Sequence, residues 1–221
     1  MQDWTWGAAG KHPIVKDYIS LGQETPLLHV FSRWVEEGYH KVNEDTTHRS
    51  WRFFAKGMKR AELSCGLLRN SHDGVGRPFP FIILGSGPLE GWEPRWEILP
   101  LAFDTLWERM EYLCAKRVFD LTELKKDIER LPNPSLPEEG QFVVESGSEL
   151  PQQQDGILSI PLKGTGDPRE EIIQCLMLFK SRSHHIPDAV FIGGPAEQSF
   201  LVIFTRSLNM ADFKKLWAVE L

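Results

Sequence analysis

Three short apolar runs in the first half of the chain constrain its fold more than any other feature. They cover residues 51–55, 63–68 and 79–84, and the short segments between them are rich in Gly, Lys, Asn and Asp. Links of this length favour antiparallel pairing, because parallel strands need a longer crossover. The sequence therefore predicts an antiparallel sheet built around these runs.

Helical periodicity surrounds the three runs. Apolar residues recur at three- and four-residue spacing from Thr25-Pro26 to about Val42, with Thr25 as the cap and Pro26 in the first turn. The remaining expected helices cover 99–113, 121–131, 168–180 and 209–217, and the remaining expected strands cover 3–6, 157–162, 189–192 and 200–204. Residues 8–13 are expected to form a loop after the first strand.

The order of these elements predicts the fold class. Strands with helices before, between and after them indicate an α/β layered sandwich with a mixed, mostly antiparallel sheet and helices on its faces. The segment 132–156, rich in proline and polar residues, is the candidate seam, with at most a short strand over 142–144. A C-terminal piece of about 80 residues would bury little surface alone. We therefore expect one domain over 1–221.

Charge and composition exclude several classes of function. The 31 acidic residues against 25 basic ones give a net charge of −6, which disfavours binding to nucleic acid. No apolar run approaches the roughly 20 residues that a membrane-spanning helix needs, and the N-terminus lacks the pattern of a secretory signal. Three widely separated cysteines fit neither a disulfide framework nor a zinc motif. We expect a cytoplasmic protein without a metal.

Two segments carry a specific pattern of residues. The first is Gly10-Lys11-His12-Pro13, followed by Asp17. The second runs from Gly66 to Pro80, and a tryptophan-led run that begins at Trp51 precedes it. Within the second segment the informative positions are Ser71, Asp73, Gly76, Arg77, Phe79 and Pro80.

Both segments resemble the TagF family, which is associated with type VI secretion. That family opens with a Gly-Lys-x-Pro turn and later has a Ser-x-Asp-x-x-Gly-Arg-x-Phe-Pro segment after a tryptophan-led strand. The resemblance implies a longin-like α/β fold, no cofactor, no catalytic step, and post-translational repression through a protein partner that carries a forkhead-associated domain. The interaction or structural residues it implies are Lys11, Pro13, Asp17, Trp51, Ser71, Asp73, Gly76 and Arg77.

Chemistry at the second segment allows an alternative. A hydrolase or phosphate-handling enzyme could be centred on Ser71, Asp73 and Arg77, although neighbouring residues of an extended segment alternate in direction, so His72 faces away from both. A serine nucleophile would then need a remote histidine such as His48 or His184. The glycines beside Asp73 could cradle an anion, but a turn is the expected reading, with Arg77 paired to Asp73 or Asp17.

The tryptophans and the histidine pair carry weaker hypotheses. Trp92 and Trp96 lie in a segment interrupted by Gly and Pro, where they could anchor a partner, but burial in the core is the expected outcome. His184 and His185 have no third ligand at a telling spacing, so we expect them to be solvated.

Overall fold

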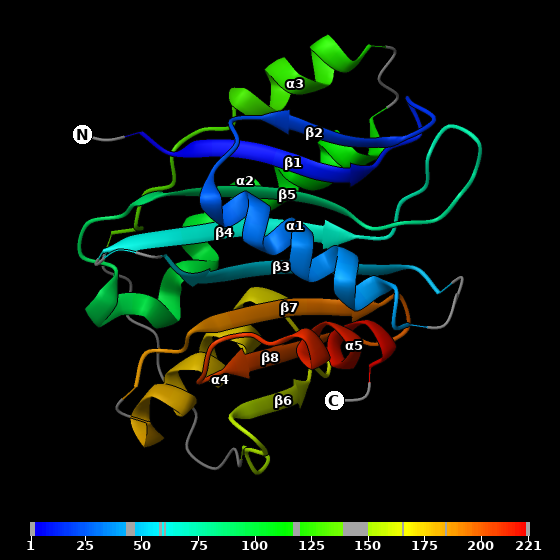
Figure 1. Ribbon diagram of the computed structural model, residues 1–221. Coiled ribbons are helices and arrows are strands. Elements are labelled where there is room, and N and C mark those ends of the chain that lie inside the picture. Colours follow the sequence, from blue (N-terminus) through cyan, green and yellow to red (C-terminus); the bar gives the residue numbers. More distant parts are fainter. Residues whose placement is uncertain are drawn as a thin grey trace.

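The computed structural model describes residues 3–42, 47–57, 59, 61–116, 120–138, 150–164, 166–183 and 185–219. Its described strands form one eight-stranded sheet in the order β2-β1-β5-β4-β3-β7-β8-β6 (Figure 1). The strands are β1 (Thr5–Lys11), β2 (Tyr18–Gly22), β3 (Arg49–Lys56), β4 (Glu62–Arg69), β5 (Phe81–Pro88), β6 (Ile157–Pro161), β7 (Ala189–Pro195) and β8 (Phe200–Phe204). The helices are α1 (Pro26–Tyr39), η1 (Glu93–Ile98), α2 (Leu99–Ala115), α3 (Leu121–Glu129), α4 (Pro168–Arg182) and α5 (Met210–Ala218).

The three central strands pair as the short links require. β4 lies between β3 and β5, and both pairings are antiparallel over the full length of the strands. Every other pairing of the described strands is antiparallel as well. The expected α/β sandwich is confirmed, and its sheet has no parallel pair among the described strands.

Helices cover both faces of the sheet. In Figure 1, α1 and α5 lie in front of it, with α2 and α4 behind. The front core joins α1 and α5 to the aromatic residues of β3, β7 and β8, and Trp34 contacts Phe191 and Phe213 edge-on or tilted. The core on the other face contains the apolar side chains of η1, α2, α3 and α4. Each face of the sheet is therefore buried, as a three-layer fold requires.

The chain after residue 131 extends the same sheet. β7 pairs with the edge of β3 from Arg49↔Pro195 to Ala55↔Ala189, and β8 and β6 follow outward. The described strands on both sides of the candidate seam therefore share one sheet, while a single domain over 1–221 stays a prediction. The strand expected over 142–144 lies outside the described residues.

Two expectations at the N-terminus were wrong. β1 continues through Gly7 to Lys11, where a loop was expected, and the edge strand β2 was not predicted at all. The small residues of β1 serve packing: a Cβ on Gly7 would lie 2.6 Å from Cδ2 of Leu28 in α1. Gly7 thus lets helix α1 approach the strand closely, which the local sequence alone does not reveal.

The expectation that Trp92 and Trp96 belong to the core is confirmed. The two side chains are only 4% and 3% exposed, and the ring of Trp96 meets Phe179 of α4 edge-on. The short helix η1 turns this Pro-containing segment inward. Neither tryptophan is therefore available as a surface anchor.

The last helix is held by a buried ion pair. Arg206 donates from both terminal nitrogens to the two carboxylate oxygens of Asp212, at 2.7 and 2.8 Å. The same carboxylate accepts the backbone N–H of Asn209, and the Asn209 side chain completes the capping box. Because Asp212 is buried, these donors replace the water that would otherwise solvate its charged carboxylate.

Replacing Asp212 by Ala should lower the free energy of unfolding by about 2–3 kcal/mol, because it removes the cap and leaves Arg206 without its partner; the estimate allows for the partial exposure of Arg206. The exposed cap Asp120 of α3 is the control, and Asp120→Ala should cost about 1 kcal/mol. Urea unfolding of both variants measures the difference. Equal losses would contradict the structural role given to the Arg206–Asp212 pair.

Candidate functional site

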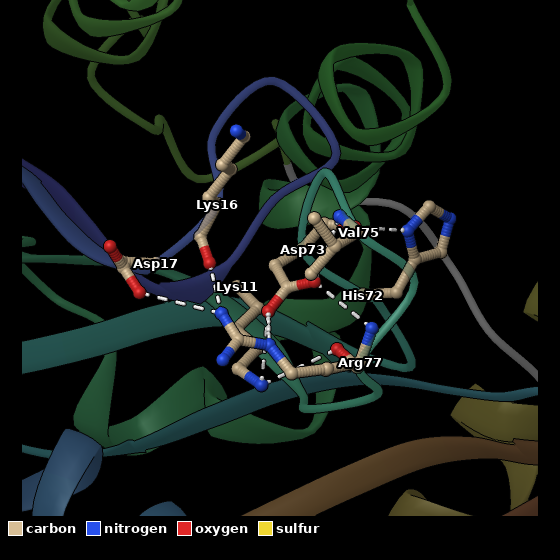
Figure 2. A network of polar contacts seen from close by, with 7 residues as sticks. All are labelled: Lys11, Lys16, Asp17, His72, Asp73, Val75 and Arg77. Carbon is tan, nitrogen blue, oxygen red and sulfur yellow. Dashed lines mark hydrogen bonds and ion pairs between the residues drawn. The ribbon is translucent and has the colours of Figure 1, made fainter.

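The two motif segments meet at one end of the sheet. The first forms the end of β1 and the loop to β2, residues 12–17, and the second forms the loop from β4 to β5, residues 70–80. Figure 2 shows Lys11 from the end of β1 and Arg77 from the second loop at the carboxylate of Asp73, with Asp17 of the first loop beside Arg77. Segments separated by more than 50 residues in the sequence are thus joined at one point.

The Asp73 carboxylate is buried and accepts from four donors. Its Oδ1 accepts the backbone N–H groups of Val75 and Arg77, at 3.1 and 2.9 Å. Its Oδ2 lies 2.6 Å from Nε of Arg77 and 3.3 Å from Nζ of Lys11. With the side chain of Asp73 at 0% exposure, these contacts replace its hydration completely.

The same contacts determine the pKa of Asp73. Burial alone would raise the pKa of this carboxyl, but the hydrogen bonds from Arg77, Val75 and Lys11 stabilise the charged form more strongly. The net result is a pKa well below the ordinary value for aspartate. Asp73 therefore remains ionised in the folded protein near neutral pH and has no proton to donate as a general acid.

Arg77 links the two loops. One of its terminal nitrogens donates to the backbone carbonyl of Lys16 and lies 3.4 Å from Oδ1 of Asp17 (Figure 2). The backbone adds another link, from the N–H of Gly74 to the carbonyl of Val15 at 2.5 Å. We call Lys11, Asp17, Asp73 and Arg77 the clasp. Pairing of Arg77 with Asp73 or Asp17 was predicted, and the structure has both contacts.

The two charged partners of the clasp differ in burial. The side chain of Arg77 is 57% exposed, whereas that of Asp73 is fully buried. Asp17 is 89% exposed, so its contact with Arg77 lies at the protein surface. The loops are therefore organised around the carboxylate, and the arginine covers it.

Two glycines allow the loops to adopt these conformations. Gly10 has φ +123°, and a Cβ there would lie 2.1 Å from the carbonyl oxygen of Pro80. Gly76 has φ +89° in the turn that Asp73 caps, with open space around it. Gly10 thus brings β1 against the second loop, and Gly76 supplies the turn geometry. Pro13 lies exposed in the first loop, with its carbonyl near Gly74.

The residues of the enzyme alternative do not converge. Asp73 is buried in the clasp, whereas His72 is exposed and its Nδ1 lies 2.8 Å from the backbone carbonyl of Asp73 (Figure 2). Ser71 lines a separate hollow beside His48, which neither Asp73 nor Arg77 lines. His184 lies outside the described residues. The three proposed residues therefore occupy two different environments.

Trp51 lies apart from the clasp. It belongs to β3, is fully buried, and meets Phe191 edge-on in the core beneath α1 and α5. Its place in the motif is therefore explained by packing. Sequence reasoning did not identify the backbone carbonyl of Lys16, because a backbone acceptor has no sequence signal. It also missed the burial of the His12 ring, which meets Phe81 of a distant strand edge-on.

The described part of the chain was searched for a metal site and for a membrane-spanning helix. No group of three His, Cys, Asp or Glu side chains there is placed to hold a metal ion. None of the described helices combines the length and the apolar character needed to span a bilayer. The three cysteines are free thiols, and burial raises the pKa of Cys65 well above its ordinary value.

Comparison with known proteins agrees with the location of the motifs. The family described as TagF N-terminal domain, type VI secretion system-associated, matches residues 7–131. Among solved structures, the crystal structure of PA0076 from Pseudomonas aeruginosa PAO1 matches with a TM-score of 0.60 and 17% identity, covering 97% of this chain and 94% of that chain. This likeness concerns the fold. No curated protein matches the sequence.

Replacing Asp73 by Ala should lower the melting temperature more than Arg77→Ala does. The first change leaves four donors without their acceptor, whereas the second leaves the carboxylate with Lys11 and two backbone N–H groups. Lys16→Ala is the control and should have no effect, because only its backbone carbonyl takes part. Thermal unfolding ranks the variants, and a greater loss for Arg77→Ala would refute the central place of Asp73.

The lowered pKa of Asp73 also predicts an acid dependence. A carboxyl whose folded pKa lies below its unfolded value of about 4 stabilises the protein above that value and loses this effect as pH falls through the folded pKa. As the pH is lowered from 5 to the lowest pH at which both proteins fold, the melting temperature of the wild type should therefore fall more than that of Asp73→Asn. Parallel curves for the two proteins would show that Asp73 titrates normally.

Proposed function

The chain belongs to the TagF family of type VI secretion-associated proteins, and we propose that it is an accessory regulator that represses type VI secretion after translation by binding a protein of the apparatus. The partner we propose carries a forkhead-associated domain, and the site of action is the cytoplasm. The observation that carries the proposal is the family match over 7–131, the region that contains both motif segments and the clasp.

The clasp supports a binding role because it makes two loops into one ordered surface. Asp73 and Arg77 are engaged with each other and with the first loop, which leaves neither free for chemistry. Val75 of the second loop is 57% exposed, and Tyr18, where β2 begins after the first loop, is 44% exposed. Exposed apolar and aromatic side chains on a pre-ordered surface are suited to protein contact.

The enzyme alternative has less support. A hydrolase centred on Ser71, Asp73 and Arg77 would need these groups to face one reacting atom in a shared cavity. In the described structure Asp73 is held by four donors and only Ser71 lines a hollow. We therefore propose that the protein acts by stoichiometric binding, without turnover of a substrate.

Raising the level of this protein in a bacterium with its own type VI system should suppress effector release while the abundance of the secretion components stays constant. Suppression should increase with the amount of the protein, because a binding repressor acts stoichiometrically, and Ser71→Ala should repress as well as the wild type. Immunoblots of culture medium and cells measure both quantities. Unchanged effector release under strong overproduction would refute repression, and loss of repression in Ser71→Ala would favour the enzyme.

A matched pair of surface variants tests where the partner binds. Val75 on the second loop and Val30 on α1 are both 57% exposed, so changing either to Asp should leave the fold intact. Val75→Asp should relieve repression and reduce capture of the partner from the native host, whereas Val30→Asp should do neither. The reverse pattern would place the contact surface on α1.

A further inference from the structure

The hollow beside the clasp has an unusual charge environment. It has a volume of about 590 Å³ and lies where the end of α2 approaches the first turn after β1 and the ends of β3 and β4. Its polar lining comes from Arg69, Asn70, Ser71 and the histidines His12, His48 and His72. Among its described lining residues there is neither an aspartate nor a glutamate.

Arg69 is the centre of positive charge in this hollow. Its guanidinium donates to Nε2 of His48 at 3.0 Å, and none of its contacts in the described part of the chain is with a carboxylate. Other arginines of this protein do have one: Arg52 bonds Glu111, Arg77 bonds Asp73 and Arg206 bonds Asp212. A partly buried guanidinium is ordinarily balanced by an anion. Among the residues that the structure describes, no carboxylate pairs with Arg69.

The neighbouring thiol does not provide that anion. Cys114 at the end of α2 also lines the hollow, and burial of its thiol raises the pKa to about 12. It therefore remains protonated at neutral pH, even beside Arg69. The positive charge of the guanidinium is left to be balanced by something that enters the hollow.

The histidines add hydrogen-bond donors around the same space. His12 is only 5% exposed, and its Nδ1 accepts the N–H of Ile14 at 3.4 Å, which puts the proton of the neutral ring on Nε2. No described group accepts that proton. Burial and then the nearby His72 lower the pKa of His12, and burial and then Arg69 lower that of His48. These shifts agree with positive groups gathered without a compensating charge.

We propose that this hollow is a binding site for a small oxyanion of the phosphate or carboxylate type, held by Arg69 with hydrogen bonds from the surrounding histidines. The anion would balance the charge of Arg69 and accept the free donors that line the space. It can be a free anion or an anionic group of a protein, because both present the same oxygen atoms. The site is separate from the clasp, and the proposal does not depend on repression of secretion.

The test is a titration of the full chain with inorganic phosphate at constant ionic strength, with chloride in its place as the control for screening. Phosphate should raise the melting temperature of the wild type in a saturable way, because a ligand that binds the folded state stabilises it. In Arg69→Gln, calorimetry should show binding weakened about tenfold or more, because a charge-assisted bond is lost. Arg109→Gln removes an exposed arginine of α2 outside the hollow and should bind as the wild type does.

Equal responses of wild type and Arg69→Gln to phosphate, or a response to phosphate no greater than to chloride, would overturn the proposal. If Arg69→Gln fails to fold, the exposed residue His72 at the rim takes its place: His72→Asn should weaken phosphate binding, and unchanged binding would again count against the site. Where Arg69→Gln no longer binds phosphate, the same variant is used to capture secretion components from the native host. The result identifies the source of the anion. Retained capture indicates a free anion, and lost capture indicates an anionic group of the partner.

Discussion

The burial of one carboxylate determines how the end of the sheet is built. Removing the charge of Asp73 from water is costly, and only hydrogen bonds and opposite charges can offset that cost. The donors come from the end of β1 and from the second loop itself, and Arg77 carries the contact on to the carbonyl of Lys16. The two loops therefore hold one another in place. Loss of the carboxylate should loosen both, because Asp73 is the only buried carboxylate of the two loops among the described residues.

This coupling gives the proposed function a physical basis. A repressor that works by binding must present a surface that is ordered before the partner arrives, since ordering a flexible loop at the moment of binding reduces affinity. The clasp joins residues 12–17 to residues 70–80, while Val75 of the second loop and Tyr18 at the start of β2 stay exposed. The neighbouring hollow around Arg69 adds a place where an anion can be recognised. Apolar contact and anion recognition are thus available at the same end of the molecule.

Much of the fold could be predicted from local sequence, and the exceptions have physical reasons. Thr25 marked the start of α1 correctly, because capping is a local interaction, and the helices expected from residues 121 and 209 begin within one residue of those positions. The length of β1 was predicted wrongly, because Gly7 was taken as the end of the strand. In the structure this glycine makes room for the side chain of Leu28. Pairing of Arg77 with Asp73 or Asp17 was expected from their place beside a Gly-containing turn, but the full burial of Asp73 also involves Lys11 of β1. The hollow was not foreseen, because its lining comes from five separate segments of the chain.

Amide hydrogen exchange in Asp73→Ala tests most directly whether this carboxylate couples the two loops. The N–H groups of Val75 and Arg77 lose their acceptor in this variant and should exchange faster for that reason alone. The coupling predicts that the N–H of Gly74, bonded to the carbonyl of Val15, and that of Val15 itself accelerate with them, while β7 and β8 stay protected. Faster exchange confined to Val75 and Arg77 would show that the first loop is held independently, and would contradict the account.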